Sequence, residues 1–109
     1  MRIRTVTFLL LAAAAALGCR AGEREETGAV YYRTVPLSAT AADSLEEALL
    51  AQPFDVMHAA STGAPGAARR GVAILAPGRA GTAARERVVA WLRARPEVAA
   101  AGLDSAGVW

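Results

Sequence analysis

The sequence of 109 residues contains no lysine, so arginine supplies all 12 basic residues, against 10 aspartates and glutamates. The formal net charge of +2 comes from Arg2 and Arg4, near the start of the chain. Without these two, 12 − 2 leaves 10 arginines for 10 carboxylates. A balanced chain lacks the basic surface that binding to a phosphate backbone requires. We therefore expect no nucleic-acid partner.

Cysteine and histidine occur once each, as Cys19 and His58. One cysteine cannot form a disulfide within the chain, and a zinc-type site needs three or four ligands. A catalytic imidazole needs a nucleophile or a carboxylate beside it, and Asp55 is expected on the opposite face of a strand from His58. We therefore expect His58 to be a partly buried or edge residue. The sequence predicts a protein that is not an enzyme, with no catalytic residue, no metal site and no cofactor.

Apolar runs long enough to span a bilayer are also missing. Residues 6–17 form an apolar run of about a dozen residues, too short for a hydrocarbon core of ~30 Å. Arg2 and Arg4 precede this run as a basic segment. The pattern is typical of a secretory signal peptide.

The run ends at Ala16-Leu17-Gly18-Cys19, which resembles the lipobox of bacterial lipoprotein precursors with Ala and Leu interchanged. The resemblance implies cleavage between Gly18 and Cys19, a diacylglyceryl thioether on the Cys19 sulfur and acylation of the new amino group. Two or more acyl chains anchor a protein stably, since each buried methylene contributes about 0.8 kcal/mol. An ordinary signal peptide with a coincidental cysteine, or a retained apolar helix, is the alternative.

These features divide the chain into a signal peptide (1–18), a lipidated cysteine with a flexible tether (19–29) and a small domain (30–109). Residues 20–29 are charged and contain no large apolar side chain, so they cannot offset the entropy of ordering. Ten flexible residues reach about 15–20 Å, which keeps the domain close to the membrane. Arg20 stands where some inner-membrane lipoproteins carry Asp, so an outer-membrane location in the cell envelope is favoured.

Periodicity within residues 30–109 predicts four strands and two helices. Ser44 and Glu47 match a capping box, Thr40 is a second candidate cap, and Thr82 is the expected cap of the later helix. The third strand is apolar at every position, which is typical of a strand covered on both faces or paired on both edges. The expected strands are 30–37, 54–60, 71–77 and 98–103, and the expected helices lie within 38–52 and 83–95; a helical continuation is the alternative for 54–60.

The resulting order, β-α-β-β-α-β, resembles the ferredoxin-like split βαβ arrangement, an α+β fold. This resemblance implies a four-stranded antiparallel sheet with both helices on one face and the first and third strands in the centre. The other face must then be solvated or meet a partner. A protein partner or a homodimer through that open sheet face is the expectation.

Three further features have structural interpretations. Residues 76–81, APGRAG, lack the complete glycine and lysine patterns of nucleotide-binding loops, so we interpret them as a strand-to-helix turn. Glu46 and Glu47 are interpreted as solvated charges near a helix N-terminus. Trp109 is expected to cover an open rim of the sheet.

Two functional hypotheses follow. The first is a lipid-anchored envelope protein with a non-catalytic binding domain. The second is a peptidoglycan tether, because residues 85–107 faintly resemble the end of OmpA-like domains, where a helix with paired valines precedes a strand. Those domains carry a Gly-His-Thr-Asp segment that is missing here, and their helix arginine aligns with Ala84 unless the register shifts to Arg85.

Overall fold

The computed structural model describes residues 28–109. The elements are β1 (Ala29–Thr34), α2 (Ala39–Leu50), β2 (Val56–Thr62), β3 (Arg70–Leu75), α3 (Thr82–Arg93), β4 (Val98–Gly102) and the 3-10 turn η1 (Ser105–Gly107). This order confirms the predicted β-α-β-β-α-β sequence of elements.

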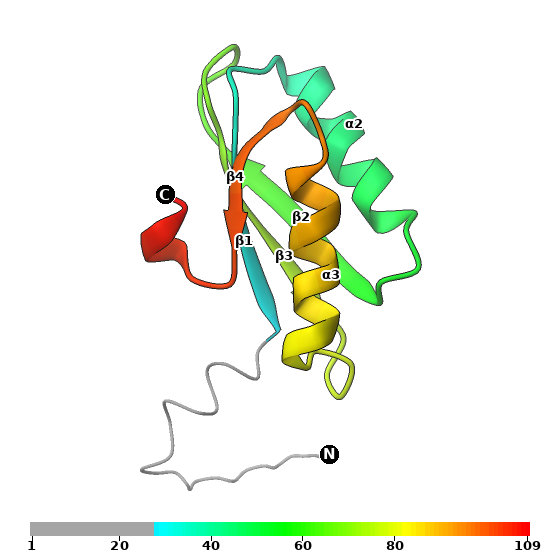
Figure 1. Ribbon diagram of the computed structural model, residues 1–109. Coiled ribbons are helices and arrows are strands. Elements are labelled where there is room, and N and C mark those ends of the chain that lie inside the picture. The colour runs from blue at the N-terminus through cyan, green and yellow to red at the C-terminus, as the bar shows by residue number, and fades with distance from the viewer. Residues whose placement is uncertain (1–27) are drawn as a thin grey trace, which may run out of the picture.

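The four strands form one antiparallel sheet in the order β2-β3-β1-β4. Both helices lie on one side of this sheet, and η1 lies on the other side (Figure 1). The predicted ferredoxin-like arrangement is therefore confirmed, with β1 and β3 in the centre.

The hydrophobic core lies between the sheet and the helices. Burial alternates along β1 and β3, so every second side chain points to the helices. The largest buried side chains of the core are Val30, Tyr32, Leu45, Leu49, Leu75, Val88 and Leu92.

Tyr32 fits this core because its cross-strand neighbour is Gly71. The ring lies over the glycine, where a Cβ atom would overlap the ring carbons. Tyr32 is 1% exposed. A large aromatic ring and a glycine on adjacent strands thus fill one site together.

The start of α2 differs from the prediction. Ser38 is its N-cap, and the Ser38 hydroxyl accepts a hydrogen bond of 3.0 Å from the backbone N–H of Ala41. The alanine-rich residues after Ser38 favour a helix, so α2 begins before Ser44, which is an exposed residue within it. The predicted caps Thr40 and Ser44 are therefore wrong.

The start of α3 also differs. Gly81 is the N-cap and makes no side-chain hydrogen bond, while Thr82 is the first helical residue. The expected cap at Thr82 is therefore wrong by one residue.

A β-bulge changes the predicted face pattern of β2. Val56 pairs with Leu75 on the helix side, but the register shifts before His58, which pairs with Ile74 on the other side. The extra residue, Met57, is 58% exposed. A regular alternation would place Val56 and His58 on one face, and the bulge separates them.

β3 is paired on both edges but covered on one face only. Ala73 and Leu75 are buried under the helices, whereas Val72 and Ile74 are half-buried on the other side. Of the two explanations for its apolar sequence, pairing on both edges holds and coverage of both faces is wrong.

Candidate functional site

Gly18 and Cys19, the predicted cleavage and lipidation residues, lie outside the described residues. Within residues 28–109 no helix has the length and apolar character needed to cross a membrane. The proposed anchor therefore depends on the sequence pattern.

His58 is exposed on β2, opposite Ile74. Asp55 precedes the strand with φ of 61° and forms an ion pair of 3.5 Å with Arg79. Within the described part of the chain, no three His, Cys, Asp or Glu side chains gather as metal ligands. His58 on β2 thus lies opposite Ile74, whereas Asp55 is paired with Arg79.

The turn at 76–81 joins β3 to α3. Arg85 donates from Nε to the Ala80 carbonyl at 3.0 Å and from an Nη atom to the Thr82 hydroxyl at 3.4 Å. Arg85, which aligns with the helix arginine of OmpA-like domains after a register shift, is therefore hydrogen-bonded at the beginning of α3.

Glu46 and Glu47 lie in the middle of α2, because the helix begins earlier than predicted. Glu46 is half-buried and Glu47 is exposed. The interpretation of both as solvated charges near the helix N-terminus is wrong.

Glu46 belongs to a polar cluster beneath the helices that the sequence analysis missed. Its carboxylate accepts a hydrogen bond of 2.8 Å from the Ser61 hydroxyl, which in turn accepts one of 2.9 Å from Arg69 Nε. The Tyr32 hydroxyl is buried and makes no hydrogen bond with the described residues that meets the usual distance and angle limits, although the Ser61 hydroxyl is close enough to affect its pKa. Burial and the negative charge of Glu46 raise the pKa of Tyr32, while Arg69 and Ser61 act in the opposite direction. This cluster joins α2, β1 and β2.

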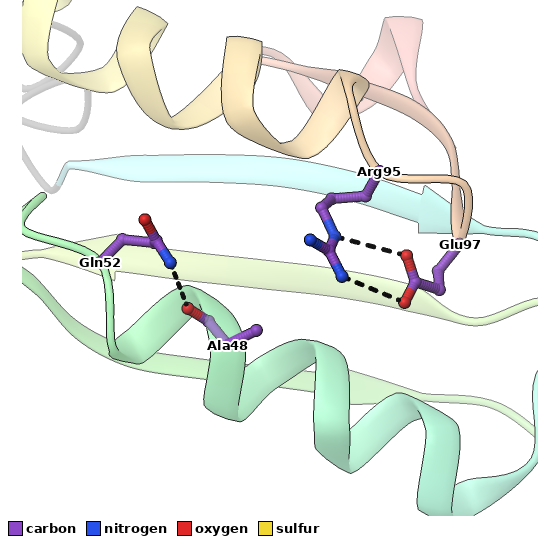
Figure 2. A network of polar contacts seen from close by, with 4 residues as sticks. All are labelled: Ala48, Gln52, Arg95 and Glu97. Carbon is purple, nitrogen blue, oxygen red and sulfur yellow. Dashed lines mark hydrogen bonds and ion pairs between the residues drawn. The ribbon is translucent and has the colours of Figure 1, made fainter.

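Two separate pairs of polar contacts lie on the helix side of the sheet (Figure 2). Arg95 Nε and a Glu97 carboxylate oxygen are 3.4 Å apart, and the Arg95 guanidinium lies 5.1 Å from the Trp91 ring centre. On α2, Gln52 donates to the Ala48 carbonyl at 3.1 Å. The Arg95–Glu97 ion pair thus follows the end of α3, and the Gln52 hydrogen bond lies at the end of α2.

A cleft of about 250 Å³ lies between α3 and the edge strand β4. Its lining includes Val89, Ala90, Arg93 and Leu103. Arg93 Nε donates to the Ala101 carbonyl at 3.0 Å. This hydrogen bond engages a backbone carbonyl of the edge strand β4, and a charged side chain at a sheet edge disfavours pairing with another chain.

The sheet face away from the helices, called the open face below, has two parts. On the β2 and β3 part, Val72 and Ile74 are half-buried and Ala60 is exposed. The members of the open face are Ala29, Tyr31, Arg33, His58, Ala60, Thr62, Arg70, Val72, Ile74, Ala100 and Gly102, as the strand register requires.

The β1 and β4 part of the open face is covered by residues 103–109. Trp109 meets the Tyr31 ring edge-on at 5.4 Å between ring centres, and its indole N–H donates to the Tyr32 carbonyl at 3.0 Å. Val108 is buried, and its carbonyl accepts a hydrogen bond of 2.9 Å from Arg33 Nε. Trp109 therefore covers part of the sheet, but on the face of the central strand β1 and not at the rim that the sequence analysis expected.

Two arginines stand directly opposite each other at one end of the open face. Arg33 on β1 pairs in register with Arg70 on β3. None of the four strands contains aspartate or glutamate. Like charges on directly opposite residues destabilise a sheet, because the Cβ atoms of such pairs are about 5 Å apart. The strand register therefore brings two positively charged residues to the same end of the open face.

The sequence analysis identified the open face but missed the arginine pair. Neighbouring strands in the centre of the sheet bring these residues together from positions 37 apart, as 70 − 33 gives. No local pattern indicates such a contact. The sequence analysis placed the first and third strands in the centre of the sheet, but it assigned Arg70 to the loop before the third strand, whereas β3 begins at Arg70.

Comparisons with protein-family models, with curated proteins and with solved structures gave no match to this chain. The site is therefore interpreted from its own geometry. An apolar surface next to paired arginines can hold another molecule by burial and by charge-assisted hydrogen bonds.

Proposed function

We propose that this chain is a lipid-anchored protein of the bacterial cell envelope, and that its small domain acts by binding another protein and not by catalysis. The anchor is supported by Ala16-Leu17-Gly18-Cys19 at the end of a short apolar run. The binding role is supported above all by the open face, on which Val72 and Ile74 stay half-buried without a covering helix.

The short stretch of chain between Cys19 and the domain fits a binding domain that is held at a membrane. The described domain begins at Gly28, next to β1, nine residues after Cys19, as 28 − 19 gives. If these residues act as the tether that their composition predicts, they reach about 15–20 Å. The domain would stand near the membrane surface, with its sheet accessible to proteins of the same compartment. Arg20 favours the outer membrane.

The anchor is tested by the intact mass of the N-terminal peptide from protein expressed in the native host or a close relative. We expect a peptide that begins at Cys19 and carries the mass of acyl chains, and we expect it to disappear in Cys19→Ser. A peptide without added mass, or one that still carries Met1, would contradict the anchor.

The binding role is tested by a photo-crosslinking residue placed at Ala60 on the open face, with Glu47 on the outer side of α2 as the matched control. Both positions are exposed. We expect one defined cross-linked product from position 60 and none from position 47. Equal patterns at both positions would contradict binding through the open face.

The alternative, a peptidoglycan tether similar to OmpA-like domains, is tested on the same preparation. The Gly-His-Thr-Asp segment of those domains is missing from this sequence, which does not favour this alternative. Sedimentation of the purified chain with isolated cell wall, abolished by Arg85→Gln, would replace the present proposal.

A further inference from the structure

Arg33 and Arg70, called the arginine pair below, lie on the open face and indicate which charge the partner carries. We propose that the arginine pair receives carboxylates from an acidic partner protein, whose apolar side chains cover Val72 and Ile74. This inference rests on the binding role proposed above and names the partner's chemistry. The strand register places both arginines opposite each other on the open face.

The two arginines differ in burial and in hydrogen bonding. Arg33 is half-buried, and its Nε is hydrogen-bonded to the Val108 carbonyl. Arg70 is exposed and makes no ion pair with any described residue. A guanidinium has five N–H donors, so both side chains keep donors for a ligand. Each guanidinium can donate charge-assisted hydrogen bonds to a carboxylate, so two arginines on opposite residues of neighbouring strands match a pair of carboxylates.

The surroundings favour a protein over other anions. The arginine pair adjoins Val72 on β3 and the Tyr31 ring on β1, so the charged and apolar parts of the surface are continuous. A free inorganic anion would contact the arginines only and leave the apolar part exposed. Arg33 also lies five residues along β1 from Gly28, about 16 Å of strand, so the pair is at the end of β1 away from the proposed tether.

A second copy of this chain is a poorer occupant, because its open face has the same charges. The strands provide arginine but no carboxylate to face it. Asp104, in the segment that crosses the open face, is hydrogen-bonded to the backbone N–H of Ala106. Two open faces in contact would bring four arginines together. Charge complementarity therefore indicates an acidic surface on a different protein.

The test is a titration of the full chain, isotope-labelled and held in detergent micelles, followed by amide and arginine Nε–H chemical shifts. The probe is the capped tetrapeptide Glu-Val-Glu-Val, which in extended form places both carboxylates on one side. The matched peptide Gln-Val-Gln-Val keeps its shape without charge. We expect saturable shifts at Arg33, Arg70 and Val72 with the first peptide, and binding at least about tenfold weaker with the second.

Protein variants distinguish binding of the acidic peptide by the arginine pair from attraction by any positive charge of the chain. Arg70→Gln should weaken binding of the acidic peptide about tenfold, and Arg70→Lys should restore part of it, since lysine keeps the charge without the fork of donors. Arg87→Gln is the matched control, because Arg87 is exposed on α3, on the other side of the sheet. It should bind like the unchanged chain. The amide spectrum of each variant verifies that the fold is retained.

Several results would overturn the proposal. These are equal binding of the two peptides, equal weakening by Arg70→Gln and Arg87→Gln, shifts confined to other surfaces, or no shifts at all. Inorganic phosphate that produces the same shifts at the same concentration would indicate a free-anion site. A dimer in sedimentation experiments, with the open face protected, would indicate a second copy. The mass of the Cys19 peptide is independent of all these outcomes, so failure of the arginine pair is distinguishable from failure of the anchor.

Discussion

The contact between Tyr32 and Gly71 gives the sharpest stability prediction. In Gly71→Ala the new Cβ atom would overlap the Tyr32 ring, which cannot move toward solvent because it is 1% exposed. Inserting a methyl group into a filled core costs about 1–3 kcal/mol. Because the overlapping atoms belong to a rigid ring, displacing the ring also gives up part of its burial, and full truncation of a large aromatic costs about 3–5 kcal/mol. We expect the free energy of unfolding to fall by about 2–4 kcal/mol.

Such a loss is large for this chain. A folded domain of this size has a free energy of unfolding of about 4–12 kcal/mol. Each kcal/mol lowers Tm by about 4–8 °C in domains of 60–100 residues. Gly71→Ala should therefore lower Tm by at least about 8 °C. Urea unfolding followed by circular dichroism gives the free energy, and a thermal scan gives Tm.

Two comparisons make the reasoning refutable. Gly107→Ala, at a glycine with no atom near its virtual Cβ, should stay within about 0.5 kcal/mol of the unchanged chain. Tyr32→Leu removes the ring, so the double variant with Gly71→Ala should lose less stability than the sum of the two single changes. If Gly71→Ala alone is as stable as the unchanged chain, or if the two changes are additive, the ring does not occupy the space above Gly71.

Three further predictions test other contacts. Tyr32→Phe removes a buried hydroxyl that has no hydrogen-bond partner among the described residues, so the free energy of unfolding at pH 7 should stay equal or rise by about 1 kcal/mol. Because the pKa of Tyr32 is raised above its ordinary value of 10.0, the unfolded chain loses this proton first; stability should fall as pH rises past 10, by up to about 1.4 kcal/mol per pH unit, and less steeply in Tyr32→Phe. Ser38→Ala should lower the free energy of unfolding in urea by about 1 kcal/mol, and Ser44→Ala should leave it almost unchanged. A larger loss in Ser44→Ala than in Ser38→Ala would mean that Ser44 is the cap of α2. Deleting Trp109 removes its ring contact with Tyr31 and its hydrogen bond, so we expect a loss of about 1–2 kcal/mol and stronger fluorescence of a hydrophobic dye; unchanged dye binding would mean that Trp109 does not cover the open face.

The sequence by itself determined the class of fold. Apolar alternation, the proline and glycine positions and two amphipathic segments depend on neighbours along the chain, and they predicted both helices and all four strands. The apolar third strand indicated its central place in the sheet. The same local information could not choose between Ser38 and Ser44 as the cap of α2, since both can accept a backbone hydrogen bond and the alanines between them favour a helix in either case.

Only the tertiary structure decided which side chains meet across strands. The bulge at Met57 moved His58 to the open face, because one extra residue reverses the faces of all that follow. Residues 103–109 covered β1 and β4, and the strand register set Arg33 opposite Arg70. These contacts join residues that are distant in the chain, so their energies depend on packing and register and not on local propensity. The surface to which we assign partner binding was therefore produced by the assembled sheet, while the proposed lipid anchor is read from the sequence alone.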